Sequence, residues 1–440
     1  MVAQLIVHPQ TGPLTGSVPL PADEQILLPR LALGVLSRGR STYLGAAGGR
    51  AVRIFLEALA RFGVVSEIEG DRVVVQGTGI AGLSESSEAL DLRGEAQAAA
   101  LLIGLVAARP FETELYVDDV VLDTLGPVLT SLGLAESGSE PGARRLLLRG
   151  TGARPEGLEL VTSGLFPWVK QALLLLGLRA SGPTLIEEQL ASADHLERAL
   201  LRVRAPFEVV GSQILLHPPR DEDALAPSTW EAVGSMDLVA YLGAAACLVP
   251  GSRVEARGVG TNPTRSGFLT LARLLGGQTG FSPQGDAQGE PFGNIWFGGS
   301  KLRPADLAGE QMVRLGDGAL PLSVLLGQAE GTSSLTDLVS SGRSSDARVF
   351  QRLGGYLMNA GVRVQPSDIG LALEGRRGQR FRALEVTTGG DPRLGLLGSV
   401  LGLFADGPSV IDDVDCLRDI FPRWVGTLRA LGATIEVRTT

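Results

Sequence analysis

Side chains that could act as amine bases are limited to two in this chain. Lys170 and Lys301 are its only lysines, and every other one of its 39 Lys and Arg residues is an arginine. Arginine stays protonated in proteins, whereas lysine loses its proton readily when buried. Asp317 and Asp346 are the carboxylates that we consider as possible general bases. Proton-transfer chemistry therefore has few candidate groups.

Cysteine and histidine do not form a pattern typical of a metal or redox site. Cys247 and Cys416 lie far apart in apolar surroundings, and the three histidines, His8, His195 and His217, are scattered. Two cysteines cannot form a disulfide framework, and no ligand spacing typical of zinc is present. We expect neither a metal nor a cofactor.

Charge and hydropathy exclude two classes of partner. The net charge of -9 argues against a general nucleic-acid surface, which normally requires a basic field. No apolar run approaches the ~20 residues needed to cross a bilayer, and the first residues have no charged leader. We expect a cytoplasmic protein that acts as a monomer and binds neither nucleic acid nor membranes.

A repeated helix end followed by a β-rich stretch is the strongest pattern along the chain. Glycine favours the left-handed conformation that closes a helix. Leu-rich segments that end in glycine, or once in alanine, recur along the chain. A second helix is expected between consecutive ends, for example over residues 97–106 and 231–248. Six such units in two groups of three predict an α/β protein with two domains. The six ends are at Gly63, Gly133, Ala205, Gly276, Gly361 and Gly432.

Short sequence words, in order along the chain, resemble those of the enolpyruvyl transferase family, which includes EPSP synthase. Residues 192–200 read Ser-Ala-Asp-His-Leu-Glu-Arg-Ala-Leu, similar to the family's Ser-Arg-Asp-His-Thr-Glu-Arg-Met-Leu. Residues 259–267 read Val-Gly-Thr-Asn-Pro-Thr-Arg-Ser-Gly, and residues 329–332 read Ala-Glu-Gly-Thr. Gly-Asp-Pro-Arg at 390–393 resembles the family's Gly-Asp-His-Arg. The resemblance covers almost the whole chain.

This resemblance implies a fold, a domain division and an activity. The fold is the two-domain inside-out α/β barrel, built from six βαβαββ repeats. The N-terminal domain comprises residues 18–228, and the C-terminal domain comprises residues 1–17 plus 229–440. In the family, a cleft between the domains binds phosphoenolpyruvate and shikimate 3-phosphate, and the carboxyvinyl group moves from the first to the second. Helix N-termini that point into this cleft would attract such anions.

The family's site residues can be carried over position by position. Asp317 stands one place before the family's catalytic aspartate, and Arg343 takes the place of its lysine. Arg393 corresponds to the arginine that contacts phosphoenolpyruvate. The remaining predicted substrate-binding residues are Arg30, which follows the first family arginine by one place, Ser163 in the phosphate triplet, and Arg418 near the late lysine.

Several basic positions of the family site carry another residue here. Glu24 replaces a lysine that meets both substrates, Glu95 occupies the anion-binding turn, and Ala100 replaces an arginine. Three hypotheses therefore remain from the sequence. The protein is a divergent carboxyvinyl transferase, a non-catalytic binding module that kept the barrel, or a different small-molecule enzyme that uses Asp317 or Asp346 as its base.

Overall fold

The computed structural model describes residues 3–46, 49–136, 144–164, 166–219, 225–337 and 347–439. The chain divides into two compact units. The N-terminal unit consists of Ala22–Ala232 and Asp286–Glu290, and the C-terminal unit of Met1–Pro21, Val233–Gly285 and Pro291–Thr440. The predicted division after residues 17 and 228 lies close to these bounds. It did not anticipate that the short segment Asp286–Glu290 belongs with the N-terminal unit.

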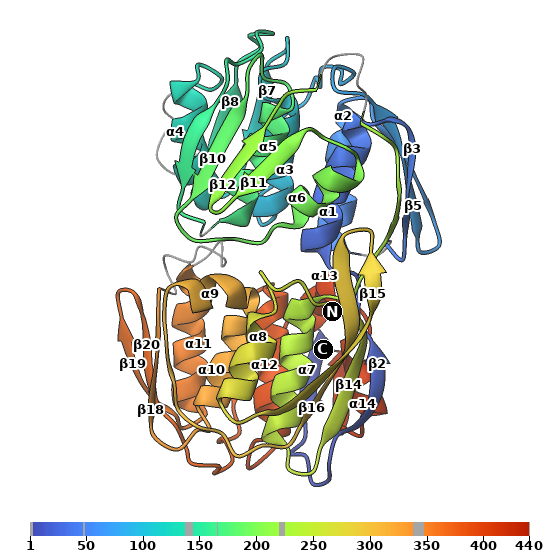
Figure 1. Cartoon of the computed structure of the whole chain (residues 1–440). Coiled ribbons are helices and arrows are strands. Elements are labelled where there is room, and N and C mark those ends of the chain that lie inside the picture. The colour runs from blue at the N-terminus through green and yellow to red at the C-terminus, as the bar shows by residue number, and fades with distance from the viewer. Residues whose placement is uncertain are drawn as a thin grey trace. The chain divides into compact units, whose positions relative to one another are not determined.

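The N-terminal unit contains three sheets and alternating helices (Figure 1). Its sheets have the strand orders β13-β3-β5-β4, β6-β7-β8 and β11-β12-β10-β9. Its helices are α1 (Glu24–Leu36), α2 (Arg50–Arg61), α3 (Ala96–Val106), α4 (Asp119–Ser131), α5 (Pro167–Gly177) and α6 (His195–Arg202). Its strands are β3 (Arg38–Leu44), β4 (Val65–Glu69), β5 (Arg72–Thr78), β6 (Leu90–Asp91), β7 (Thr113–Tyr116), β8 (Arg145–Leu148), β9 (Glu159–Thr162), β10 (Thr184–Glu188), β11 (Phe207–Val210), β12 (Gln213–Leu216) and β13 (Thr229–Glu231).

The C-terminal unit repeats this plan with the sheets β15-β16-β14-β2, β17-β18-β20-β19 and β21-β22-β1-β23. Its helices are α7 (Met236–Leu248), α8 (Gly267–Leu274), α9 (Glu310–Leu315), α10 (Ala319–Leu326), α11 (Ala347–Asn359), α12 (Pro392–Leu403), α13 (Leu417–Ile420) and α14 (Trp424–Ala430), with the 3-10 turns Gly316–Gly318 and Val414–Cys416. Its strands are β1 (Ala3–Val7), β2 (Thr15–Pro19), β14 (Arg253–Gly260), β15 (Gln278–Ala287), β16 (Glu290–Gly298), β17 (Asp306–Leu307), β18 (Thr332–Thr336), β19 (Arg363–Ser367), β20 (Gly370–Glu374), β21 (Glu385–Thr387), β22 (Ser409–Asp412) and β23 (Ile435–Thr439).

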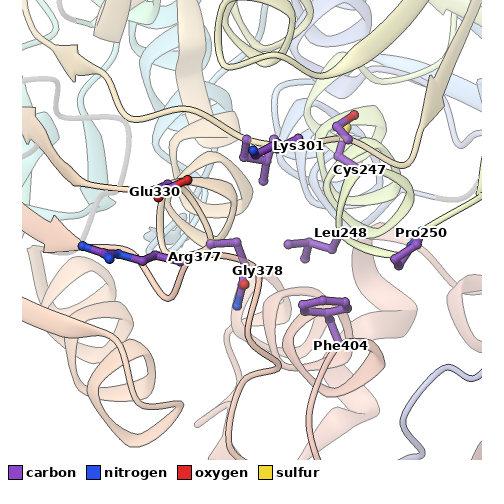
Figure 2. A pocket seen from close by; sticks show the side chains of 11 residues that line it. Cys247, Leu248, Pro250, Lys301, Glu330, Arg377, Gly378 and Phe404 are labelled. Carbon is purple, nitrogen blue, oxygen red and sulfur yellow. The ribbon is translucent and has the colours of Figure 1, made fainter.

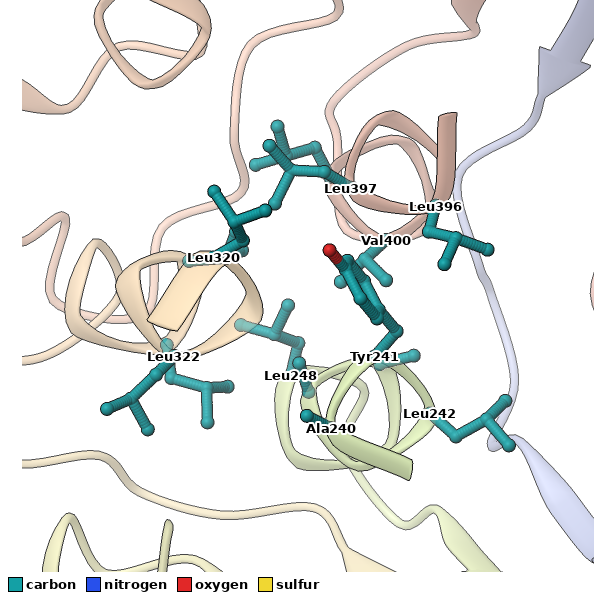
Figure 3. Packing of buried hydrophobic residues seen from close by; sticks show 14 of the residues in the cluster. Ala240, Tyr241, Leu242, Leu248, Leu320, Leu322, Leu396, Leu397 and Val400 are labelled. Carbon is teal, nitrogen blue, oxygen red and sulfur yellow. The ribbon is translucent and has the colours of Figure 1, made fainter. Parts of the chain in front are cut away.

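Each repeat pairs a helix that is apolar all round with an amphipathic one. A helix with apolar residues on every side must be surrounded by protein, whereas an amphipathic helix buries one face only. Helices α1, α3 and α5 form the interior of the N-terminal unit, and α7, α10 and α12 form that of the C-terminal unit, with the sheets outside. Figure 3 shows Leu320 of α10 and Val400 of α12 packed around Tyr241 of α7. The predicted inside-out α/β barrel is therefore confirmed.

The N-terminal strand completes the last sheet of the chain. In β1, Ile6 pairs with Val410 of β22 and with Glu436 of β23, both in antiparallel register. The other four-stranded sheets with described pairings combine one parallel pair with antiparallel neighbours, as in β9-β10 and β10-β12. The first residues thus belong to the C-terminal unit, as the resemblance implied.

The predicted helix ends are present, with two differences in detail. The glycines at 63, 133, 276, 361 and 432 all have positive φ and follow the ends of α2, α4, α8, α11 and α14. In the third copy the left-handed residue is Arg204, with φ 63°, rather than the predicted Ala205. The helix predicted over 231–248 begins at Met236, because Glu231 pairs in β13 and the Ser235 hydroxyl caps the helix by accepting from Leu238 N at 3.4 Å.

Candidate active site

Arg393 and Asp317 come together in the C-terminal unit from helices in different repeats. Asp317 lies in the 3-10 turn that precedes α10, and Arg393 lies in the first turn of α12. Arg393 Nη1 is 3.8 Å from Asp317 Oδ1. Asp391 is the N-cap of α12 and accepts from Arg393 through both carboxylate oxygens, at 3.0 Å from Nε and 2.7 Å from Nη2. We call these three residues the Arg393 cluster.

The two carboxylates of the Arg393 cluster keep the guanidinium of Arg393 protonated. Burial alone would lower the pKa of Arg393, but Asp317 and Asp391 outweigh this effect and raise it above its usual value. The side chains of Arg393 and Asp317 are 18% and 26% exposed, so solvent still reaches both. A fixed, partly exposed guanidinium can bind a phosphate or carboxylate, and an adjacent carboxylate can exchange a proton with a bound molecule.

Tyr241 of α7 lies in the core of the unit beside Leu320 and Val400 (Figure 3). The charges of the Arg393 cluster act on its hydroxyl. Its hydroxyl is buried and has no hydrogen-bond partner among the described residues. Burial raises the pKa of Tyr241 well above its usual value, and the charge of Asp317 adds to this increase. The phenol is therefore neutral at all physiological pH values. The sequence did not indicate that Tyr241 lies near the site, because a tyrosine in an apolar helix is typical of a hydrophobic core.

Glu24 in the N-terminal unit serves as an internal anion at a helix N-terminus. Helix α2 begins after Gly49, which supplies no side-chain cap, and the Glu24 carboxylate accepts from Val52 N at 3.4 Å. A Cβ at position 49 would lie 1.7 Å from Glu24 Oε1, so glycine is required for this approach. Free N–H groups and the helix dipole attract an anion at this place. The chain itself provides that anion.

Glu95 adds a second carboxylate close to Glu24. It is the N-cap residue of α3, and its Oε1 lies 3.6 Å from Nη1 of Arg50 in α2. Burial raises the pKa of Glu24 to about 7, and the charge of Glu95 contributes to this increase. Glu24 therefore changes its protonation state near neutral pH. We call Glu24, Glu95 and Arg50 the Glu24 cluster.

Lys170 is part of a buried ion network in the N-terminal unit rather than a free amine. Its Nζ lies 2.9 Å from Glu188 and 2.6 Å from Glu197, and its side chain is 1% exposed. Burial would lower the pKa of Lys170, but the two carboxylates outweigh burial and raise it. Ser192 also donates its hydroxyl to Glu188 at 2.6 Å. This lysine is consequently unsuited to act as a base.

Arg30 is not placed to bind a substrate, which corrects that prediction. It donates to the backbone carbonyls of Glu231 at 3.0 Å and Ala287 at 2.7 Å, and its guanidinium lies 4.8 Å from the ring centre of Trp230. The side chain is 2% exposed. Its hydrogen bonds tie α1 to β13 and to the segment Asp286–Glu290. A guanidinium so enclosed acts in the fold of the unit.

The other predicted site residues have different surroundings. Ser163 follows β9 in the loop before α5 of the N-terminal unit. Arg418 lies in α13, where its 79% exposed side chain pairs with Asp415 at 3.5 Å. Arg343 and Asp346 fall outside the described residues. Within the C-terminal unit, the structure places the predicted residues Asp317 and Arg393 in contact.

Asp391 belongs to the Arg393 cluster but was not among the predicted site residues. Asp391 stands directly before a proline and a helix, which is the ordinary signal for an N-cap, and it holds Arg393 in place. His195, one of the three scattered histidines, is buried in the N-terminal unit against Glu290, with Nδ1 2.7 Å from Oε1. Its role is to join α6 to the segment Asp286–Glu290.

Neither metal binding nor membrane insertion is supported by the described part of the chain. No group of three or more His, Cys, Asp or Glu side chains there could hold a metal ion. No described helix is both long enough and apolar enough to cross a membrane. The chemistry available to the Arg393 cluster is anion binding and proton transfer.

Comparison with known proteins identifies the family. A model of the family EPSP synthase (3-phosphoshikimate 1-carboxyvinyltransferase) matches residues 9–428. The 3-phosphoshikimate 1-carboxyvinyltransferase of Parvibaculum lavamentivorans is 30% identical over 437 residues, which cover 97% of this chain and 96% of that protein. The protein of the same name from Shouchella clausii is 28% identical over 423 residues, with 95% and 96% coverage.

Two solved structures show the same fold. The EPSP synthase from Acinetobacter baumannii superposes with a TM-score of 0.83 at 24% identity, covering 99% of this chain and 100% of that one. The enolpyruvyl transferase NikO from Streptomyces tendae has a TM-score of 0.75 at 16% identity, with 100% and 99% coverage. The chain therefore belongs to the EPSP synthase (3-phosphoshikimate 1-carboxyvinyltransferase) family.

Proposed function

We propose that this protein transfers the carboxyvinyl group of phosphoenolpyruvate to a hydroxyl of shikimate 3-phosphate or a related acceptor. The family match over residues 9–428 supports the reaction class, and the pairing of Arg393 with Asp317 carries the proposal at the level of the site. In this reaction the acceptor oxygen forms a bond to the vinyl carbon of phosphoenolpyruvate. The bond from that carbon to the phosphate oxygen breaks, inorganic phosphate leaves, and the hydroxyl proton is released.

Within this proposal, Arg393 binds an anionic group of a substrate and Asp317 moves a proton. A guanidinium held by Asp391 loses little conformational entropy when it binds, because its orientation is already fixed. Its charge balances a desolvated phosphate or carboxylate. Asp317 contacts the same guanidinium and is partly exposed, so a bound hydroxyl can approach it. The required acid–base group and anion-binding group are thus neighbours.

The Glu24 cluster predicts how substrate binding in this protein depends on pH. Two carboxylates where the family resemblance implies a cationic anion-binding site repel a phosphate when both are ionised. Because the pKa of Glu24 is raised to about 7, its protonation below neutral pH removes the contribution of Glu24 to this repulsion. We therefore propose that phosphate-bearing substrates bind more strongly below pH 7 than above it.

The test is release of inorganic phosphate from phosphoenolpyruvate in the presence of shikimate 3-phosphate. Wild-type protein should release phosphate, and Arg393→Met should lose at least about 100-fold in kcat/KM, equivalent to about 2.7 kcal/mol. Arg363→Met is the matched control, because Arg363 is 82% exposed and pairs with Glu374 on the surface. It should keep wild-type activity.

A second variant distinguishes a loss of activity from a loss of folding. Arg393→Lys retains a positive charge, so a folded protein with partly recovered activity assigns the loss in Arg393→Met to missing charge. Absence of phosphate release from folded wild-type protein at millimolar substrates contradicts the transferase proposal. A folded Arg393→Met variant that retains full activity contradicts the role assigned to Arg393 rather than the reaction.

A further inference from the structure

A pocket in the C-terminal unit lies at the ends of α7, α10 and α12 that are opposite the Arg393 cluster. Cys247 and Leu248 come from the last turn of α7, Gln328 follows α10, and Phe404 is the C-cap of α12. Its volume is about 220 Å³. Helix α12 has twelve residues and is about 18 Å long, so the pocket is separate from the cluster at its N-terminal end.

Gln328 gives this pocket an unsatisfied hydrogen-bonding group. Its side chain is 5% exposed and lines the pocket, yet neither Nε2 nor Oε1 has a hydrogen-bond partner among the described residues. An amide buried without partners costs about 1–3 kcal/mol. Its backbone is fixed, because its carbonyl accepts from Gly378 N at 3.2 Å and its N–H donates to Leu325 O at 3.0 Å. The Gln328 amide therefore offers a donor and an acceptor from a fixed backbone position.

The rest of the lining combines one apolar side with two opposite charges (Figure 2). Leu248, Pro250 and Phe404 lie on one side of the pocket, and Lys301 and Glu330 lie on the other. The guanidinium of Arg377 extends away from them. In the described part of the chain, neither Lys301 nor Glu330 takes part in an ion pair.

Cys247 does not add a reactive group to this lining. Burial raises the pKa of Cys247 to about 12, so its thiol stays protonated. Three helix C-termini at the pocket also contribute partial negative charge, which favours a bound ammonium group. The pocket is thus suited to binding rather than to covalent chemistry.

We propose that this pocket binds a small zwitterion, namely a free α-amino acid with an apolar side chain. Its carboxylate would pair with Lys301 and accept from Gln328 Nε2, and its ammonium would pair with Glu330 and donate to Gln328 Oε1. Its side chain would pack against Leu248 and Phe404. Gln328, Lys301 and Glu330 each gain a partner of the opposite kind, which neither a simple anion nor a simple cation achieves. Leucine and phenylalanine have the chemistry required.

The first experiment is a calorimetric titration of the full-length protein with L-leucine. Two matched analogues each lack one charge: 3-methylbutylamine has no carboxylate, and 4-methylpentanoate has no ammonium. L-Leucine should bind at least tenfold more tightly than either analogue, and a parallel titration with L-phenylalanine reports the side-chain size that fits. No saturable heat with millimolar L-leucine or L-phenylalanine overturns the proposal, and so does equal affinity for an amino acid and its analogues.

Variants show where the amino acid binds and distinguish a loss of binding from a loss of folding. Gln328→Leu should weaken amino-acid binding at least tenfold while the melting temperature stays the same or rises, because an unpaired amide is replaced by an apolar group of similar size. Lys301→Met should weaken binding to a similar degree. Arg393→Met, at the other end of α12, should bind as wild type does. Undiminished binding in Gln328→Leu, or a lower melting temperature that shows the amide to be paired within the fold, overturns the proposal.

Discussion

Replacing Glu24 by glutamine should stabilise the N-terminal unit at high pH and leave its stability at low pH nearly unchanged. A carboxyl group whose pKa is higher in the folded state holds its proton more tightly there than in the unfolded chain. For Glu24 the pKa rises from the usual 4.5 to about 7. Below about pH 4.5, Glu24 is protonated in both the folded and the unfolded chain. No ionised carboxylate is then buried, and folding pays no penalty for it. Between these values stability falls as pH rises, and above about 7 the cost is complete.

The magnitude follows from the size of this change. Each pKa unit corresponds to about 1.4 kcal/mol, so the difference between 4.5 and about 7 sets an upper value of about 3.4 kcal/mol. Glu24 is only half-buried, and solvent reduces the penalty, so we expect about 1–3 kcal/mol. Glutamine keeps an oxygen that accepts from Val52 N, which preserves the cap of α2.

Urea denaturation followed by tryptophan fluorescence at pH 5 and pH 8 measures this effect. The gain in unfolding free energy of Glu24→Gln over wild type should be larger at pH 8 than at pH 5 by about 1–2 kcal/mol, because part of the penalty is already present at pH 5. Glu67→Gln is the matched control, because Glu67 pairs with Arg40 on the surface and is 53% exposed. Its effect on stability should be small at both pH values, because exposed ion pairs contribute about 0–1 kcal/mol. An equal effect of Glu24→Gln at the two pH values refutes the reasoning.

Three other substitutions test the buried charges of the N-terminal unit. Arg109 is 1% exposed, its Nη1 and Nη2 have no partner among the described residues, and burial lowers its pKa to about 9. Arg109→Met should therefore raise unfolding free energy by about 1–3 kcal/mol in urea denaturation, and a decrease contradicts this view. Lys170→Met leaves Glu188 and Glu197 without their cation. This variant should lower the unfolding free energy by about 3–5 kcal/mol, again measured by urea denaturation. Arg30→Met removes two hydrogen bonds to carbonyls and the contact with Trp230, and it should lower the melting temperature, by an amount equivalent to about 2–4 kcal/mol. A melting temperature equal to that of wild type would show that Arg30 does not hold these segments.

The repeating architecture was predictable because its signals are local. A helix end with a left-handed residue depends on a few consecutive residues, and glycine marks it in five of the six predicted places. Arg204 adopts the same conformation without glycine, which explains why the third end was placed one residue late. The start of α7 was wrong for a different reason. Residues 229–231 pair with β3, and such pairing with a distant strand leaves no local signal.

The candidate site was predictable only in part, because its contacts join residues far apart in sequence. The family resemblance supplied Arg393 and Asp317, whose proximity depends on the packing of α10 and α12 in one unit. Arg30 was misassigned because its partners, Glu231 and Ala287, lie 201 and 257 residues away. The acidic residue at position 24 was visible in the sequence. Its use as the cap of α2 required the fold to bring Gly49 beside it.

Phosphate release is the measurement that tests the central claim most directly. Purified wild-type protein would be mixed with phosphoenolpyruvate and shikimate 3-phosphate at pH 6 and pH 8, with Arg363→Met and Arg393→Met assayed in parallel. The proposal predicts release that requires both substrates, that is stronger at pH 6, and that is lost in Arg393→Met alone. A folded wild-type protein that releases no phosphate at either pH would contradict the assignment of carboxyvinyl transfer to this member of the family.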